Sequence, residues 1–196
     1  MDAVREYLKS LLDVAFRPFA HALLWCRITP NQVSLMGILL NLVTAALIVT
    51  DHLVTAGIMY LLAGSFDLLD GILARMGKMA TRFGAFLDST ADRISEGVVF
   101  AAIAYRFAFD DQSVDAAIAV LALLGSLLVS YTRARAEGLG LECKVGIVTR
   151  AERVLLVAFG LLLDLLPQAI YVLVVLTTFS VTQRIVHTLR QLYPQG

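Results

Sequence analysis

Long apolar runs separated by short polar breaks fill the chain from about residue 33 onward. A helix that crosses a bilayer needs about 20 mostly apolar residues, and six segments come near that length. The predicted helices lie at roughly Val33–Thr50, Leu53–Leu73, Phe83–Phe107, Ser113–Arg133, Arg150–Leu166 and Gln168–Leu189. The pattern therefore predicts an all-α fold, a bundle of six transmembrane helices.

The breaks carry residues that end or begin helices. Thr29-Pro30-Asn31 combines a capping residue with a proline suited to a first helical turn. Asp51-His52 predicts a tight turn, and the segments 110–113 and 166–168 predict polar connections. The glycine-containing segment Glu137–Thr149 predicts a loop or a short surface helix.

An amphipathic stretch at about residues 2–20 precedes the first span. Its apolar residues recur at helical spacing, with Arg5, Glu6, Lys9 and Asp13 between them. They are Val4, Tyr7, Leu8, Leu11, Leu12, Ala15, Phe16 and Phe19. The stretch is charged throughout, unlike a signal peptide, and predicts a helix in the membrane interface; a packed helix of a soluble cap is the alternative. Residues 1–196 are thus expected to form a single membrane domain, with the six spans at about 33–189.

Composition agrees with a membrane protein: 59% of the 196 residues are hydrophobic, and the mean hydropathy is +0.79, above the range of soluble domains. The 16 basic and 16 acidic residues cancel, which argues against nucleic-acid binding. Cys26 and Cys143 form no metal-like motif and are expected to be reduced.

The distribution of basic residues predicts the orientation. With six spans, both termini share one side with the second–third and fourth–fifth connections, whereas the other side has only Arg106. The basic side carries Arg5, Lys9, Arg17, Arg27, Arg75, Lys78, Arg82, Arg133, Arg135, Lys144, Arg150, Arg153, Arg184 and Arg190. The positive-inside rule therefore predicts a multi-pass protein of the cell membrane with both termini in the cytoplasm.

Four aspartates interrupt the second and third spans. Asp67 and Asp70 are three residues apart and Asp88 and Asp92 four apart, so each pair shares one helix face. A charge at the centre of a membrane helix costs at least ~2.5 kcal/mol on insertion scales, so four carboxylates need a partner. The short connection suggests antiparallel neighbouring helices with both pairs towards their cytoplasmic ends. Converging carboxylates favour a hard cation such as Mg²⁺, Mn²⁺ or Ca²⁺ over zinc.

Structural ion pairing is the alternative for these aspartates. Asp67 or Asp70 would pair with Arg75, and Asp92 with Arg93. Such pairs explain one or two acids, but not four in register.

The acidic residues belong to a longer pattern. The sequence reads Asp67-x-x-Asp70-Gly71-x-x-Ala74-Arg75, then eight residues, then Gly84-x-x-x-Asp88-x-x-x-Asp92. In these residues and spacings the chain resembles the CDP-alcohol phosphotransferase family. Six spans and an amphipathic N-terminal helix are also that family's plan, so the resemblance covers most of the chain.

The resemblance implies an enzyme that displaces CMP from a CDP-linked lipid, usually CDP-diacylglycerol, with an alcohol as nucleophile. It implies two divalent ions, Mg²⁺ or Mn²⁺, held by Asp67, Asp70 and Asp88. Asp92 would be a further ligand, the general base that deprotonates the acceptor, or both.

A nucleotide site is also implied by the resemblance. Gly71, Ala74 and Gly84 would leave room for the cytidine, and Arg75 would reach a phosphate. The segment before the first span would help to hold the nucleotide, although a plain helix cap remains the alternative. Together with Asp67 and Asp70, this site comprises Pro30, Asn31, Ser34, Gly71, Ala74, Arg75 and Gly84.

A second polar cluster suggests the acceptor. Arg133, Arg153 and Arg184 each lie near a span end on the same side, and arginine favours phosphate through its forked donors. Positive-inside topology and anionic lipid headgroups are the alternative explanation. The strings SYTRARAE and VGIVTRAER resemble the branch that makes phosphatidylinositol phosphate, or its archaeal counterpart, from inositol 1-phosphate. Arg133 stands where that branch commonly has lysine.

Rival functions make different predictions. Glycerol 3-phosphate or another alcohol as acceptor would need a comparable anion pocket. An intramembrane prenyltransferase also uses aspartates and Mg²⁺, but usually in two distant motifs. A cation transporter would leave the arginine clusters unexplained. The partners expected are a CDP-linked lipid, a phosphorylated polar alcohol and membrane lipids, and the resemblance allows a homodimer, although no interface stripe stands out.

Overall fold

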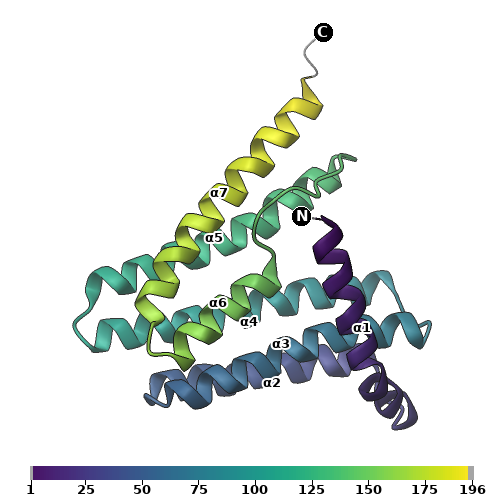
Figure 1. The fold of residues 1–196 in the computed structure, drawn as a ribbon, viewed down its shortest axis with the longest axis horizontal. Helices are drawn as coiled ribbons and strands as arrows, with labels where there is room; N and C mark the ends of the chain where they lie inside the picture. The colour runs from purple at the N-terminus through teal and green to yellow at the C-terminus, as the bar shows by residue number, and fades with distance from the viewer. Residues whose placement is uncertain (1, 194–196) are drawn as a thin grey trace.

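The structure is a computed structural model that describes the backbone of residues 2–193 and the side chains of residues 14–193. Within this part of the chain there are seven helices and no strand (Figure 1). They are α1 (Asp2–Trp25), α2 (Pro30–Val49), α3 (Leu53–Met76), α4 (Arg82–Phe109), α5 (Ser113–Gly138), α6 (Arg150–Leu162) and α7 (Leu166–Leu192). The prediction of an all-α fold is confirmed.

Helix ends follow the local signals in the sequence. Thr29 caps α2: its hydroxyl accepts from the backbone N–H of Gln32, whose side chain in turn accepts from the backbone N–H of Thr29 at 2.8 Å. Pro30 occupies the first helical position, where its missing N–H costs nothing. Asp51 turns the chain between α2 and α3 with a φ of 63°, a conformation that aspartate tolerates better than most residues.

One predicted connection was wrong. The segment 166–168 is the first turn of α7, and the turn between α6 and α7 lies at residues 163–165 with Asp164 at a φ of 57°. Pro167 suits that first turn because a proline is tolerated at the start of a helix. Segment 139–149 is irregular, because α5 continues to Gly138 and α6 begins at Arg150.

Four helices, α2, α3, α5 and α7, are long and apolar enough to cross a membrane. Of the other two predicted spans, α4 has 28 residues but carries Asp88, Asp92, Arg93, Glu96 and Arg106. Helix α6 has only 13 residues. The chain is therefore a multi-pass membrane protein by its apolar helices.

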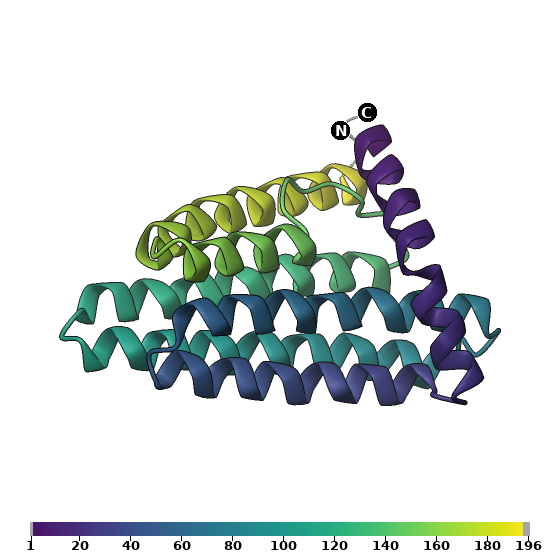
Figure 2. The ribbon, with the colours of Figure 1, turned by 60° about the horizontal axis from the view of Figure 1, so that its bottom comes forward.

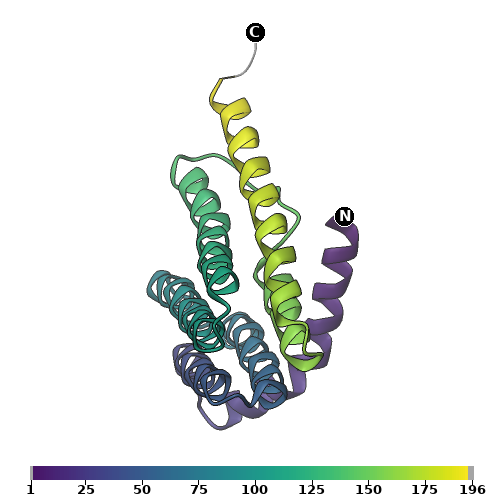
Figure 3. The ribbon, with the colours of Figure 1, turned by 90° about the vertical axis from the view of Figure 1, so that its left-hand side faces the viewer.

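The packed helix pairs form a closed ring. Helix α2 packs against α3 and α4, α5 against α4 and α7, and α6 against α7 and α3. The sequence predicted α3 and α4 to be antiparallel neighbours; the most extensive packing of each is with α2, and α6 also packs on α3 (Figures 1 and 3). This arrangement leaves room between the aspartate-bearing faces of α3 and α4.

Helix α1 stands steeply across the ends of α2 and α3 (Figure 2). Its C-terminal part packs on α3, with Ala20 buried in a cluster with Leu69, Ile72 and Leu73. Phe19 and Trp25 are exposed. The predicted apolar positions Val4, Tyr7, Leu8, Leu11 and Leu12 lie outside the described side chains.

Candidate active site

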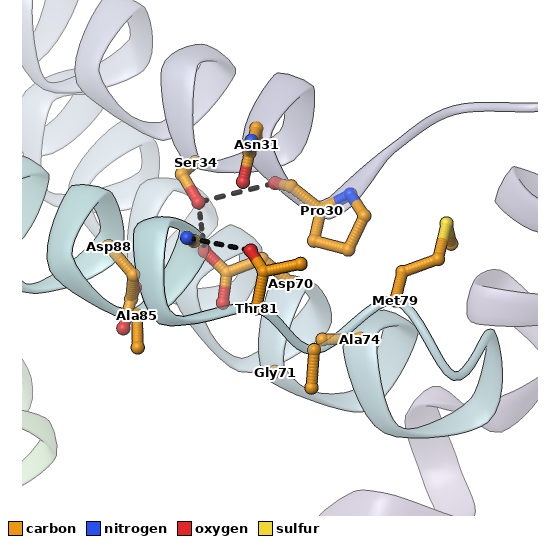
Figure 4. A pocket seen from close by; sticks show the side chains of 12 residues that line it. Pro30, Asn31, Ser34, Asp70, Gly71, Ala74, Met79, Thr81, Ala85 and Asp88 are labelled. Atoms are coloured by element: carbon orange, nitrogen blue, oxygen red, sulfur yellow. Dashed lines mark hydrogen bonds between the residues drawn. The ribbon is translucent and has the colours of Figure 1, made fainter.

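A pocket of about 190 Å³ lies where the start of α2, the end of α3 and the start of α4 meet (Figure 4). It contains seven of the nine residues predicted to bind the nucleotide, all except Asp67 and Arg75. Its lining is Pro30, Asn31, Ser34, Asp70, Gly71, Ala74, Met79, Ala80, Thr81, Gly84, Ala85 and Asp88. We call it the first pocket.

Hydrogen bonds and small residues shape the first pocket. The buried Ser34 hydroxyl lies 2.6 Å from Oδ2 of Asp70 and also 3.2 Å from the carbonyl of Pro30 (Figure 4). A methyl group added at Gly84 would lie 3.3 Å from Oδ1 of Asn31 and 3.1 Å from Oγ1 of Thr81. Glycine at this position therefore keeps the walls apart.

Arg75 lies beside the first pocket rather than in its lining. A methyl group added at Gly71 would lie 3.5 Å from Nη1 of Arg75, so this side chain folds back towards the pocket wall. The geometry brings Arg75 to the edge of the predicted nucleotide site.

Asp67 and Asp92 face each other across the space between α3 and α4, with Arg150 between them. Nη1 of Arg150 forms an ion pair with Asp67 and lies 2.8 Å from Oδ1 of Asp92. Arg93 lies 3.5 Å from the other oxygen of Asp92. The predicted pair of Asp92 with Arg93 is thus present, but the residue that links Asp92 to Asp67 is Arg150, more than 50 residues away in the sequence.

The four aspartates are the predicted donor set of a hard-cation site. Their carboxylates repel one another across the gap between α3 and α4, and a cationic guanidinium already lies between two of them. As the side chains stand, no three acidic, histidine or cysteine groups among the described residues are close enough to hold a metal ion. Asp67 and Asp92 are turned to Arg150, and Asp70 to Ser34. The all-oxygen set fits Mg²⁺ or Mn²⁺ once these carboxylates turn.

A second pocket of about 360 Å³ lies on the other side of Asp92. It brings together all three arginines predicted to bind the acceptor phosphate. Its lining is Ser89, Asp92, Arg93, Glu96, Val129, Ser130, Arg133, Ala134, Glu137, Thr149, Arg150, Arg153 and Arg184. Asp92 lines this second pocket and Asp88 the first, so successive turns of α4 serve different pockets.

The three arginines are held in different ways. Arg153 is buried and pairs with Glu96. Arg184 is buried and donates to the backbone carbonyls of Val129 and Val145, the latter at 2.9 Å. Arg133 is half exposed and pairs with Glu137 at 2.8 Å. Two of the three cations are therefore buried, whereas Arg133 is exposed to solvent.

Glu96 and Arg150 are among the residues of the second pocket that were not predicted as site residues. Glu96 follows Asp92 by four residues, just as Asp92 follows Asp88, so the repeated spacing could have identified it. Arg150 begins α6 and was seen only as one of many basic residues. Lys144, in contrast, is 81% exposed and pairs with Glu142, whose pKa this hydrogen bond lowers.

Comparison with known proteins identifies the family. The family model for CDP-alcohol phosphatidyltransferase matches residues 27–183. The chain is 37% identical over 182 residues to a phosphatidylinositol phosphate synthase of Mycobacteroides abscessus, covering 88% of this chain and 82% of that protein. It is 37% identical over 169 residues to an archaetidylinositol phosphate synthase of Methanothermobacter thermautotrophicus, covering 83% and 84%.

The fold is also that of a solved relative. The crystal structure of Mycobacterium tuberculosis phosphatidylinositol phosphate synthase with CDP-DAG bound matches with a TM-score of 0.81 and 32% identity, covering 88% of this chain and 92% of that one. The same relative in complex with manganese and citrate matches with a TM-score of 0.79 and 32% identity, covering 87% of each chain. The chain belongs to the CDP-alcohol phosphatidyltransferase family and is therefore a membrane transferase of phospholipid biosynthesis.

Proposed function

We propose that this enzyme transfers the phosphatidyl group of CDP-diacylglycerol to inositol 1-phosphate and releases CMP. The observation that carries the proposal is that the four aspartates, Asp67, Asp70, Asp88 and Asp92, together adjoin both pockets. We call these four residues the carboxylate row. The first pocket contains the small residues with Asp70 and Asp88, the second contains the arginines with Asp92, and Arg150 joins Asp92 to Asp67. This arrangement suits a donor and an acceptor that react across the row.

The first pocket would take the CDP group. Gly71, Ala74 and Gly84 leave a slot between α3 and α4, and Asn31 offers an amide to the base or ribose. Arg75 at the pocket edge would bind a phosphate. Support comes from the relative whose structure contains CDP-DAG.

Asp67, Asp70, Asp88 and Asp92 would hold Mg²⁺ or Mn²⁺, two ions in all. When bound, such ions neutralise the diphosphate and the departing CMP. The manganese complex of the relative supports the choice of ion.

The second pocket would bind the phosphate of the acceptor through Arg133, Arg153 and Arg184. One of the free hydroxyls of inositol 1-phosphate would then point to Asp92, which lines the same pocket and faces α3. Asp92 accepts the hydroxyl proton while the oxygen attacks the lipid-linked phosphorus. That phosphorus loses its bond to the oxygen of CMP, and CMP leaves with the bonding electron pair.

The topology proposed for this reaction has six membrane-crossing helices, α2–α7, with α1 in the interface. Lysine and arginine are in excess at the end of the helix bundle that carries the two pockets. By the positive-inside rule, this excess supports an orientation in which both termini and both pockets face the cytoplasm. In that orientation the lipid chains stay in the bilayer while nucleotide and inositol phosphate enter from water.

The test is CMP release by the purified protein in detergent or liposomes. CDP-diacylglycerol and its archaeal ether counterpart are each offered with inositol 1-phosphate, inositol, glycerol 3-phosphate and serine, with Mg²⁺, Mn²⁺ or EDTA. We expect release with inositol 1-phosphate and loss of release in EDTA. If CMP is released with glycerol 3-phosphate but not with inositol 1-phosphate, glycerol 3-phosphate is the acceptor. If no donor and acceptor pair releases CMP, the enzyme assignment is overturned.

A further inference from the structure

Arg150 belongs to both halves of the site. Its Nη1 forms an ion pair with Asp67 on α3 and lies 2.8 Å from Oδ1 of Asp92 on α4. The same side chain lines the second pocket beside Arg153 and Arg184. One guanidinium therefore joins the two carboxylates and also forms part of the wall of the anion pocket.

The backbone around Arg150 is fixed, whereas its side chain has an unused donor. Thr149 and Glu152 form a capping box that sets Arg150 as the first residue of α6. The Nε of Arg150 is buried without a hydrogen-bond partner among the described residues. Buried donors of this kind are rare because they forfeit a hydrogen bond, so another arrangement that satisfies the donor is expected.

A divalent cation and this guanidinium compete for the same two carboxylates. The side chains of Asp67 and Asp92 are each 18% exposed and that of Arg150 22%, so little solvent screens their charges. Two cations that share these oxygens would repel each other strongly in such surroundings. Metal binding therefore requires Asp67 and Asp92 to release Arg150.

We infer that Arg150 is an internal counter-ion of the carboxylate row, which a divalent cation displaces into the second pocket. This inference rests on the proposed metal site. Before metal binding, Arg150 neutralises Asp67 and Asp92; afterwards its donors are available to an acceptor phosphate. Metal binding thus adds the guanidinium of Arg150 to the donors of the second pocket. The carboxylates of Asp67 and Asp92, which paired with Arg150, then bind the metal.

Thermodynamic linkage makes the coupling reciprocal: if metal releases Arg150 for phosphate, phosphate must strengthen metal binding by the same factor. Inorganic phosphate serves as a probe because it requires no turnover. We expect the coupling to depend on residue 150, since removal of its guanidinium removes the partner that the carboxylates and the phosphate would share.

The experiment measures Mn²⁺ affinity of the full-length enzyme by electron paramagnetic resonance, without CDP-lipid, with and without inorganic phosphate. Wild type is compared with Arg150→Gln, Arg150→Lys and the control Arg135→Gln, whose arginine is exposed on α5 and lines neither pocket. We expect Arg150→Gln to bind Mn²⁺ about 5- to 150-fold more tightly than wild type, the usual range of coupling between sites. Arg150→Lys should lie between them, and Arg135→Gln should match wild type.

Phosphate should tighten Mn²⁺ binding in wild type and in Arg135→Gln, but not in Arg150→Gln. Equal or weaker Mn²⁺ affinity in Arg150→Gln overturns the inference, as does phosphate coupling that survives the substitution. If Arg150→Gln does not fold, an unchanged affinity in Arg150→Lys overturns it as well. Because no step needs turnover, a wild type that binds Mn²⁺ but releases no CMP refutes the proposed function alone. An active wild type with no affinity shift in the variants refutes the counter-ion alone.

Discussion

Glu96 of α4 and Arg153 of α6 form a bidentate ion pair in the interior of the helix ring. Nε of Arg153 lies 2.8 Å from Oε1 of Glu96, and Nη2 lies 3.0 Å from Oε2. Only 4% of the Glu96 side chain and 2% of the Arg153 side chain are exposed. The pair therefore fixes the orientation of the one guanidinium nitrogen, Nη1, that remains for a phosphate in the second pocket.

Glu96→Gln is expected to weaken both stability and acceptor use. The variant leaves a buried guanidinium without its counter-charge, a change that costs about 3–5 kcal/mol in buried pairs. The KM for inositol 1-phosphate should rise at least about tenfold, since charged pairs of this kind contribute ~2 kcal/mol or more to binding. The affinity for CDP-diacylglycerol should stay close to wild type.

Thermal unfolding and acceptor titrations measure these two effects. Glu137→Gln is the matched control, because Glu137 pairs with the half-exposed Arg133 at the same pocket. It should change Tm little, since exposed pairs contribute about 0–1 kcal/mol. A Glu96→Gln enzyme with normal KM for the acceptor would refute the positioning role, whatever its Tm.

Gly84→Ala should damage the donor site specifically. The added methyl group would press on Asn31 and Thr81 at 3.3 and 3.1 Å, narrowing the first pocket. We expect the KM for CDP-diacylglycerol to rise about tenfold, equivalent to ~1.4 kcal/mol, a size typical of overpacking. Gly97→Ala on the same helix is the control, because a methyl group there meets nothing within 4 Å. Equal donor kinetics in the two variants would count against the pocket assignment.

Asp92→Asn should separate proton transfer from binding. If Asp92 is the general base, its loss lowers kcat by about 10²–10⁴-fold, while CDP-diacylglycerol binding stays near wild type. Asp67→Asn should weaken donor binding as well. Isothermal titration with CDP-diacylglycerol, run beside the CMP-release assay, distinguishes the two. If Asp92→Asn loses the donor as severely as Asp67→Asn, Asp92 acts as a ligand and not as the base.

Ser34→Ala tests the support of Asp70. The Ser34 hydroxyl lies 2.6 Å from Oδ2 of Asp70 in a buried setting, and hydrogen bonds to charged groups are worth about 1.5–3 kcal/mol. We expect a Mn²⁺ affinity at least about tenfold weaker. Ser65→Ala serves as control, because Ser65 donates to Leu61 within its own helix. Identical Mn²⁺ titrations for both variants would show that Ser34 does not orient Asp70.

Features that depend on residues close together in the sequence, such as helix caps, turns and shared helix faces, were predicted well. The cap at Thr29, the turn at Asp51 and the shared faces of the aspartate pairs all follow from local rules. The residues around Gly71 and Gly84 form one pocket because spacing fixes which side chains share a face. Glu96 obeys the same spacing as Asp88 and Asp92, so it could have been found.

Long-range packing could not be predicted in this way. The short connection between α3 and α4 predicted antiparallel neighbouring helices, but nothing in that connection predicts that α2 packs against both of them. The link from Arg150 to Asp67 and Asp92 joins segments far apart in sequence, and no periodicity encodes it. The irregular segment 139–149 determines where the Arg150 side chain reaches the space between α3 and α4. The path of this segment depends in turn on Arg184 and Ser180, whose side chains form hydrogen bonds with its backbone.

The shortness of α6 has a consequence for the membrane itself. Its 13 residues reach about 20 Å at 1.5 Å per residue, against a hydrocarbon layer about 30 Å thick. In the proposed six-span topology, segment 139–149 would cover part of the remaining depth, where irregular backbone is stable only against protein or water. A water-filled recess at this segment would then bring a sugar phosphate to the level of the lipid headgroup.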